Sequence, residues 1–348
     1  MTIRRFRYVA GGCRPGAAAG AGRRGVLAGL SATVGLALVP GSVHAIQSSR
    51  PKRHIEMLLG VRPGTSADQS ARAFGESLAA RLPGIDLTMT NVPGDAGRTM
   101  LAALGKAPAN GSTVGWVITP TLPARMIDRA EPSLGQRIQL IGQIEREPVA
   151  FVSPNSDPPN TIQDIMQRAS ADADAVPLGT PPAGSPPHLA ALRLQVLAQT
   201  QLNIVTFPSA AAARQAVLAG NVSAAALGLS EAIGDIRAGN LSAVGIAARR
   251  RFGVLPETPV LDEGGIPLSA FIRRGIAVPL GTPSDVTAML TEAMRTIAGE
   301  DGFREQAEAN GYYVTWADGP AWLEQMLTEQ AALAKLWATN PWLSSSGG

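Results

Sequence analysis

The chain has 348 residues, of which 45% are hydrophobic and only 4% aromatic, and this length favours two domains, each with its own core. Its formal net charge is +3 at pH 7, but six of the 30 basic residues and none of the 27 acidic residues lie among the first 45. The rest of the chain therefore carries 24 basic against 27 acidic residues, a balance that disfavours binding to nucleic acid.

The first 45 residues are typical of a secretory signal peptide. They combine arginines with an apolar run over 26–39 and end in Val43-His44-Ala45, which predicts cleavage near Ala45. Arg23-Arg24 suggests twin-arginine export, and the general secretory route stays open. The single cysteine, Cys13, would be removed with this segment, so the exported protein would have no disulfide. We expect a periplasmic protein.

Beyond residue 54, short apolar strands alternate with amphipathic helices, a pattern that predicts an α/β protein with parallel sheets and helices on their faces. The first strands are predicted over 55–61, 85–91 and 113–119, with a helix after each of the first two. Further along, the pattern predicts helices over 162–169, 187–198 and 210–218, strands over 176–179, 203–207, 222–228 and 272–279, and only helices between 285 and 337.

Two crossings divide the predicted chain into lobes. The Pro/Asn/Asp-rich stretch 154–160 is the expected passage to the second lobe, and the strand over 272–279 is the expected return. We therefore predict a first lobe made of 46–153 plus 276–348 and a second lobe made of 154–275.

One loop carries the strongest chemical signal. Residues 62–66 form a Gly-containing turn between a predicted strand and a helix, which would aim backbone N–H groups at an anion. Asp68 in the first turn is best interpreted as a helix cap, and Arg72 is expected to pair with a nearby acid. Taken alone, such a loop is more often an ordinary connection.

Several further motifs follow this loop in a fixed order. They are Asn91 with Gly97, the strings over 106–114 and 179–190, then 218–222, 250–260, 263–265 and 278–283. In order and spacing, they resemble the Bug, or tripartite tricarboxylate transporter substrate-binding, family of periplasmic proteins. The resemblance covers about residues 55–341. It implies a two-lobed periplasmic-binding-protein type II (Venus flytrap) fold that closes around a small carboxylate.

The resemblance also implies the ligand-binding residues. Gly64 to Ser66 in one lobe and Ala183 to Ser185 in the other would grip the ligand carboxylate from opposite sides, with Thr119 and 207–209 beside them. The complete candidate set is Gly64, Thr65, Ser66, Asp68, Thr119, Ala183, Gly184, Ser185, His188, Phe207, Ser209 and Gly228. Pro208 departs from the family pattern, which commonly has a lysine there, so the sequence does not identify the carboxylate.

Catalytic motifs are missing from the sequence. The string Gly228-Leu229-Ser230-Glu231-Ala232 stops short of G-x-S-x-G, and His54 and His188 are the only histidines outside the predicted signal peptide. No Walker loop, His-Glu-x-x-His motif or Cys-rich ligand set occurs, so we predict no enzyme activity, no metal and no cofactor. His188 is best interpreted as a hydrogen-bonded residue at a helix start.

The sequence therefore predicts a monomeric periplasmic solute-binding protein that delivers a small organic acid to membrane transporter subunits. One alternative is a sensory protein that binds ligand and presents it to a receptor without transport. A second, less favoured alternative is an exported hydrolase on the same scaffold.

Overall fold

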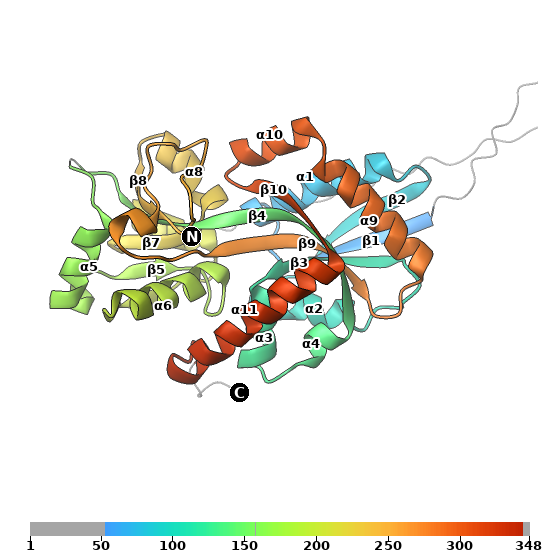
Figure 1. Ribbon diagram of the computed structural model, residues 1–348, viewed down its shortest axis with the longest axis horizontal. Helices are drawn as coiled ribbons and strands as arrows, with labels where there is room; N and C mark the ends of the chain where they lie inside the picture. The colour runs from blue at the N-terminus through green and yellow to red at the C-terminus, as the bar shows by residue number, and fades with distance from the viewer. Residues whose placement is uncertain (1–52, 157, 344–348) are drawn as a thin grey trace, which may run out of the picture. The chain divides into compact units, whose positions relative to one another are not determined.

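The computed structural model describes residues 53–156 and 158–343 (Figure 1). The predicted signal peptide, its cleavage near Ala45 and Cys13 lie outside these residues. Within the two described ranges, no helix has both the length and the apolar character needed to cross a membrane.

The first half of the described chain alternates strands and helices as the sequence predicts. Its elements are β1 (Arg53–Leu59), α1 (Ser66–Arg81), β2 (Ile85–Asn91), η1 (Asp95–Gly97), α2 (Arg98–Leu104), β3 (Thr113–Thr119), α3 (Thr121–Asp128) and α4 (Ser133–Gln136). β1 lies between β2 and β3 and is parallel to both. The returning strand β9 (Phe271–Pro279) pairs with β3 in the antiparallel direction.

One long strand joins the two halves. β4 (Ile138–Pro154) runs beside β9 as far as the pair Pro148↔Phe271, and from Val149 onward it pairs with β7 (Ala224–Gly228) and β8 (Leu241–Ile246) (Figure 1). The chain thus passes from the first half to the second within the continuous strand β4. The sequence predicts this passage slightly later, in the Pro/Asn/Asp-rich stretch 154–160. A strand that is buried along almost its whole length keeps its ladder hydrogen bonds across the crossing. The exact lobe boundaries stay a prediction.

The second half repeats the α/β pattern. Its strands β5 (Leu178–Thr180), β6 (Ile204–Thr206) and β7 are parallel, with β5 in the middle. Its helices are α5 (Ile162–Ala171), η2 (Ala173–Ala175), α6 (Pro186–Ala198), α7 (Ala210–Leu218), α8 (Leu229–Arg237) and η3 (Leu261–Gly264).

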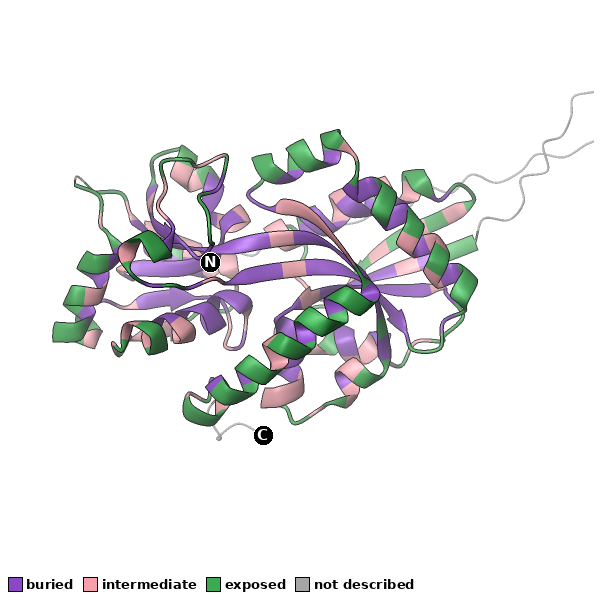
Figure 2. Cartoon of the chain, in the orientation of Figure 1, coloured by how far each residue is buried: buried purple, intermediate pink, exposed green. Residues whose placement is uncertain are grey.

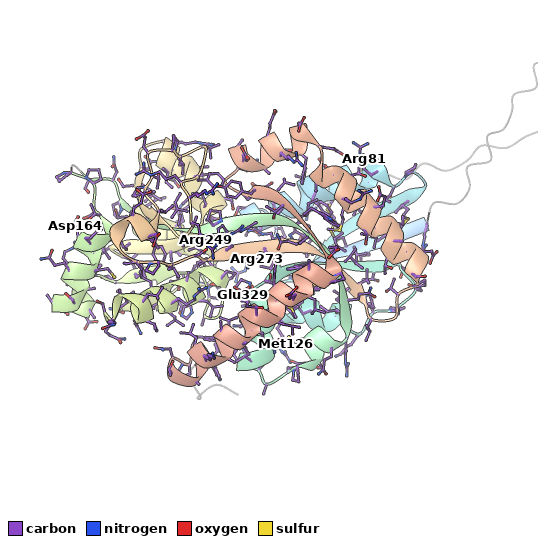
Figure 3. All side chains as sticks on the ribbon, in the orientation of Figure 1. Arg81, Met126, Asp164, Arg249, Arg273 and Glu329 are labelled. Carbon is purple, nitrogen blue, oxygen red and sulfur yellow. The ribbon has the colours of Figure 1, made fainter. Side chains whose placement is uncertain are left out.

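The C-terminal part returns to the first half. It contains α9 (Ser284–Ala298), α10 (Asp301–Ala309), β10 (Tyr313–Asp318) and α11 (Gly319–Thr339). The sequence predicts only helices here, but β10 pairs with β4, and this long-range pairing leaves no local signal. α11 lies against α3 and β4, and Arg273 on β9 forms an ion pair of 3.2 Å with Glu329 on α11 (Figures 1 and 3).

The core lies along the sheet that joins the two halves. Its strands β4, β7 and β9 are almost entirely buried, whereas α11 exposes its outer face (Figure 2). In the first half, Phe74 of α1 stacks on Trp116 of β3 with ring centroids 5.0 Å apart, and both side chains are fully buried. Burial of each such side chain contributes about 1.5–3 kcal/mol. This packing fixes the start of α1 relative to the sheet.

Candidate functional site

A cavity of about 440 Å³ lies between the two halves of the chain. Its walls come from the loops that follow β1, β2, β5 and β6, from the start of α8, and from side chains of β3, β4 and β9. Loops at the carboxyl ends of parallel strands are the usual place for a ligand site in open α/β sheets. The cavity therefore lies at the usual place for a ligand site in this kind of fold.

The N-terminus of α1 supplies hydrogen-bond donors to this cavity. Thr65 is the N-cap, and its Oγ1 accepts the N–H of Asp68 at 3.3 Å. Ser66 and Ala67 follow at the first two helical positions and both line the cavity. Their N–H groups have no acceptor in the helix and donate to no other described residue. These two amides are available to an anion, and the helix dipole favours negative charge beside them.

Asp68 organises this loop and does not line the cavity. Its side chain is buried and accepts hydrogen bonds from Gly64 N–H at 2.9 Å, Arg72 Nε at 3.0 Å and Asn91 Nδ2 at 2.8 Å. Burial raises the pKa of Asp68, but these three donors outweigh it and leave the pKa below its ordinary value. The expected pairing of Arg72 with a nearby acid is present, with Asp68 as the acid, and Thr65 is the N-cap of α1. The Gly64 amide is already used within the loop.

The opposite loop, before α6, is poorer in free amides. Ser185 is the N-cap of α6, and the next two residues, Pro186 and Pro187, have no N–H. Ser185 N–H donates to the carbonyl oxygen of Pro182 at 2.9 Å, and Gly184 N–H donates to His188 Nδ1 at 3.3 Å. The α6 side therefore does not match the α1 side in cavity-lining amides, but Ala210 at the start of α7 lines the cavity and its N–H has no acceptor among the described residues.

Ser185 still offers a polar group on this side. Its Oγ is buried and has no hydrogen-bond partner among the described residues. Because Ser185 also lines the cavity, its hydroxyl is the donor that the α6 side can offer to a ligand.

His188 is buried behind this loop. Burial and the nearby Arg125 charge lower the pKa of His188 to about 4, so the ring is neutral at pH 7 and accepts the Gly184 N–H. Arg125, from α3, donates through Nη2 to the carbonyl oxygen of Ala183 at 3.1 Å. These contacts hold the 183–185 loop in place across the two halves.

A buried charged cluster forms the floor of the cavity. Glu147 on β4 accepts Ser230 N–H at 2.8 Å and Ser230 Oγ at 2.7 Å, and its second oxygen pairs with Arg274 on β9. Arg274 also lies 3.4 Å from Glu145 Oε2, and the same oxygen accepts the Ser70 hydroxyl at 2.9 Å. Burial raises the pKa of Glu145 to about 7, although the Arg274 charge opposes this.

A hydrogen bond joins the two halves at the cavity wall. Ser66 Oγ on α1 donates to Glu231 Oε2 on α8 at 2.9 Å. Glu147, Glu231 and Arg274 all line the cavity, and none of them was selected from the sequence. The one sequence signal for Glu147 is the charged run 145–147 inside the otherwise apolar segment 144–152.

Five of the predicted site residues line the cavity, namely Thr65, Ser66, Ser185, Ser209 and Gly228. Ser209 caps α7, where its Oγ accepts Ala212 N–H at 3.1 Å. The predicted residues that do not line the cavity are Gly64, Asp68, Thr119, Ala183, Gly184, His188 and Phe207. Thr119 accepts the Trp322 indole N–H at 3.2 Å, and Gly64 and Gly184 have φ of +79° and +73°. These residues shape the loops around the cavity.

Metal ligands do not gather at this cavity. Across residues 53–156 and 158–343, no group of three or more His, Cys, Asp and Glu side chains is arranged to hold a metal ion.

Comparison with known families decides the relationship. Residues 71–335 match the model of the tripartite tricarboxylate transporter family receptor. The chain belongs to this family. Within it, the receptor is 24% identical over 297 residues to protein BugT of Bordetella pertussis, and the alignment spans 80% of this chain and 88% of BugT.

Solved structures show that this tripartite tricarboxylate transporter receptor has the two-lobed α/β fold of periplasmic binding proteins. A protein from R. palustris with adipate superposes with a TM-score of 0.77 at 18% identity, covering 83% of this chain and 97% of the other. MatC from Rhodopseudomonas palustris with bound malate gives a TM-score of 0.71 at 22% identity, covering 82% and 99%. The predicted fold class is confirmed.

Proposed function

We propose that this receptor binds a small organic carboxylate in the cavity between its halves and presents it to membrane transporter subunits. The observation that carries the proposal is the pair of unpartnered N–H groups on Ser66 and Ala67, two residues that line the cavity at the N-terminus of α1. A charge-assisted hydrogen bond of this kind contributes about 1.5–3 kcal/mol when water is excluded. The relatives with adipate and malate support a carboxylate as the ligand class.

Closure of the two halves would serve this binding. The ligand carboxylate would exchange its hydration for the two α1 amides and the Ser185 hydroxyl, while the remaining wall selects the rest of the molecule. The continuous strands β4 and β9 connect the halves, and bending there would open and close the cavity.

The chemistry of the site favours a receptor over a hydrolase. His188, which a Ser/His hydrolase would need, is 5% exposed, accepts the Gly184 N–H and does not line the cavity. His54 does not line it either. A general base must lie within reach of the proton that it removes, so neither ring is placed to activate Ser66, Ser185 or Ser209.

Location and assembly follow from the same proposal. Export with cleavage near Ala45 would place a monomeric receptor in the periplasm, where the family's transporters collect their solutes. A receptor for transport must release ligand to a membrane partner, so its bound and open forms must differ at the cavity mouth.

The test is ligand binding to purified 46–348 chain. Thermal-shift measurements with malate, adipate and 4-methylpentanoate should raise the unfolding midpoint for at least one acid, because only the folded state binds. Calorimetry of that acid should give a 1:1 complex. If these three acids, and the amino acids leucine and phenylalanine as well, leave the midpoint unchanged and give no heat, the proposed function is overturned.

A further inference from the structure

The carboxylate of Glu231 adds negative charge to the cavity wall, beside the N–H donors of α1. It is the third residue of α8, its side chain is 8% exposed, and its Oε2 accepts the Ser66 hydroxyl at 2.9 Å. Ser66 also carries one of the two free amides. The cavity therefore presents an anion-binding amide and a carboxylate side by side, and both come from residues that line it.

Few cationic side chains pair with the carboxylates near Glu231. Arg214 lies 3.3 Å from Glu231 Oε1, but it also pairs with Asp235 at 2.8 Å. Arg274 is likewise shared by Glu145 and Glu147. Glu145 can hold a proton because its pKa is about 7. The other three carboxylates, Glu147, Glu231 and Asp235, still share two guanidinium groups, which leaves an excess of negative charge beside the cavity.

The pKa of Glu231 is raised, as expected for a carboxylate with few cationic partners. Burial raises it, and the charges of Glu147 and Asp235 raise it further, so that the Ser66 hydrogen bond and Arg214 do not restore the ordinary value. A cation in the cavity would relieve this penalty.

Part of the remaining wall is apolar and contains Val61, Met100, Leu101, Trp116, Ile118 and Ile272. Asp95, Thr121 and Ser209 are polar residues of the same wall. Arg62 and Arg274 are the two cationic side chains that line the cavity. Arg274 has both terminal nitrogens engaged by Glu145 and Glu147, and Arg62 is exposed to solvent. A second ligand carboxylate placed against the apolar residues, away from Arg62, would lose its hydration without gaining a cationic partner.

We propose that the ligand is a zwitterionic amino acid with an apolar side chain. Its carboxylate accepts the Ser66 and Ala67 N–H groups, its ammonium group donates to Glu231, and its side chain packs against the apolar wall. In an α-amino acid the two charged groups share one carbon, so they need an amide donor and a carboxylate acceptor as neighbours, which Ser66 and Glu231 provide. This inference rests on the proposed function, because the same cavity and amides receive the carboxylate.

Matched ligands test the inference with the wild-type protein. Calorimetry at pH 7 compares leucine with 4-methylpentanoate and phenylalanine with 3-phenylpropanoate, pairs that differ only in the amino group. At least one amino acid should bind about tenfold or more tightly than its deaminated partner, as expected for a charged hydrogen bond. Malate should bind more weakly than that amino acid.

Glu231→Gln tests the residue itself. The change keeps the size of the side chain and a polar contact with Ser66 but removes the charge, so the preference for the amino acid should fall to about threefold or less. Glu263→Gln is the matched control, since Glu263 is 42% exposed, pairs with Arg251 and does not line the cavity. This control should keep the full preference. Thermal midpoints of both variants verify folding.

Each outcome is decisive. If 4-methylpentanoate, 3-phenylpropanoate or malate binds as tightly as the amino acids, the inference is overturned while the proposed function stands. If the amino acid is preferred but Glu231→Gln keeps that preference in a folded protein, the assignment to Glu231 is overturned. Should Glu231→Gln fail to fold, the wild-type comparison still decides the ligand class. If no acid of either kind binds, both proposals fall.

Discussion

Arg125 on α3 and Ala183 in the loop before α6 are tied together by a hydrogen bond of 3.1 Å between Nη2 and the carbonyl oxygen. The two residues come from different halves of the chain. Arg125 also pairs with Asp128, which accepts the Trp342 indole N–H at 2.7 Å, and the Arg125 and Asp128 side chains are 1% and 0% exposed. This buried pair holds the loop that carries Ser185 against the first half.

We predict that Arg125→Met destabilises the protein strongly. The substitution leaves Asp128 buried without its cation, a change that costs about 3–5 kcal/mol. Urea unfolding followed by circular dichroism measures this loss. The double variant Arg125→Met with Asp128→Asn should recover part of it, because the remaining amide still accepts the Trp342 N–H. An unfolding free energy for Arg125→Met within 1 kcal/mol of wild type, on the order of ordinary surface changes, would show that the pair is not structural.

The two loop glycines should respond differently to alanine. A Cβ on Gly184 would lie 1.6 Å from Arg125 Nη2, at a backbone φ of +73°. A Cβ on Gly64, at φ +79°, would meet nothing within 4 Å. Gly64→Ala should therefore cost only the conformational penalty of about 1–2 kcal/mol, and Gly184→Ala should cost clearly more. Equal unfolding free energies for the two variants would contradict the packing around Arg125.

The pKa of His188 predicts a loss of stability in acid. Because the folded pKa is about 4, below the ordinary 6.5, the unfolded chain takes up the proton first. Stability from this group is complete above about pH 6.5 and is lost as pH falls toward 4, by about 2–3 kcal/mol at pH 4.5. His188→Gln, which keeps an acceptor for the Gly184 N–H, should flatten this part of the profile.

Glu145 titrates in an overlapping range with the opposite sign. Burial raises its pKa to about 7, so in the folded state it holds a proton that the unfolded state releases, and its contribution falls as pH rises from about 4.5 to 7. The difference between wild type and His188→Gln isolates the histidine, because Glu145 is present in both. Parallel pH profiles of unfolding free energy in the two proteins would refute the assignment.

Local sequence patterns predict most of this fold because its strands and helices alternate in short apolar segments. β4 escapes prediction since buried Glu145 and Glu147 interrupt its apolar character, and their partners Arg274, Ser70 and Ser230 come from distant parts of the chain. β10 escapes for a related reason: its strand character depends on pairing with β4.

Only part of the predicted residue set lines the cavity, and other members form hydrogen bonds within their own loops. Thr65, Ser66 and Ser185 line the cavity as the loop motifs imply, but the amides of Gly64 and Gly184 are consumed by Asp68 and His188. Each of these bonds forms between residues four apart, so it lies within the motif that suggested a ligand contact. Glu231 reaches the cavity only through the packing of one half on the other, and no local pattern reveals it.

Binding to the α1 amides is the central claim, and a proline substitution tests it. Ser66→Pro removes one cavity-facing N–H at the first helical position, where proline is tolerated because the preceding Thr65 is extended at ψ 159°. Ser66→Ala controls for the hydroxyl. Ser284→Pro makes the same change at the start of α9, away from the cavity lining.

The deciding measurement is calorimetry of these three variants with the tightest-binding of malate, adipate and 4-methylpentanoate. Ser66→Pro should bind that acid about tenfold or more weakly than Ser66→Ala, while Ser284→Pro matches wild type. Equal affinities for Ser66→Pro and Ser66→Ala, in folded proteins, would show that the carboxylate does not lie at the N-terminus of α1.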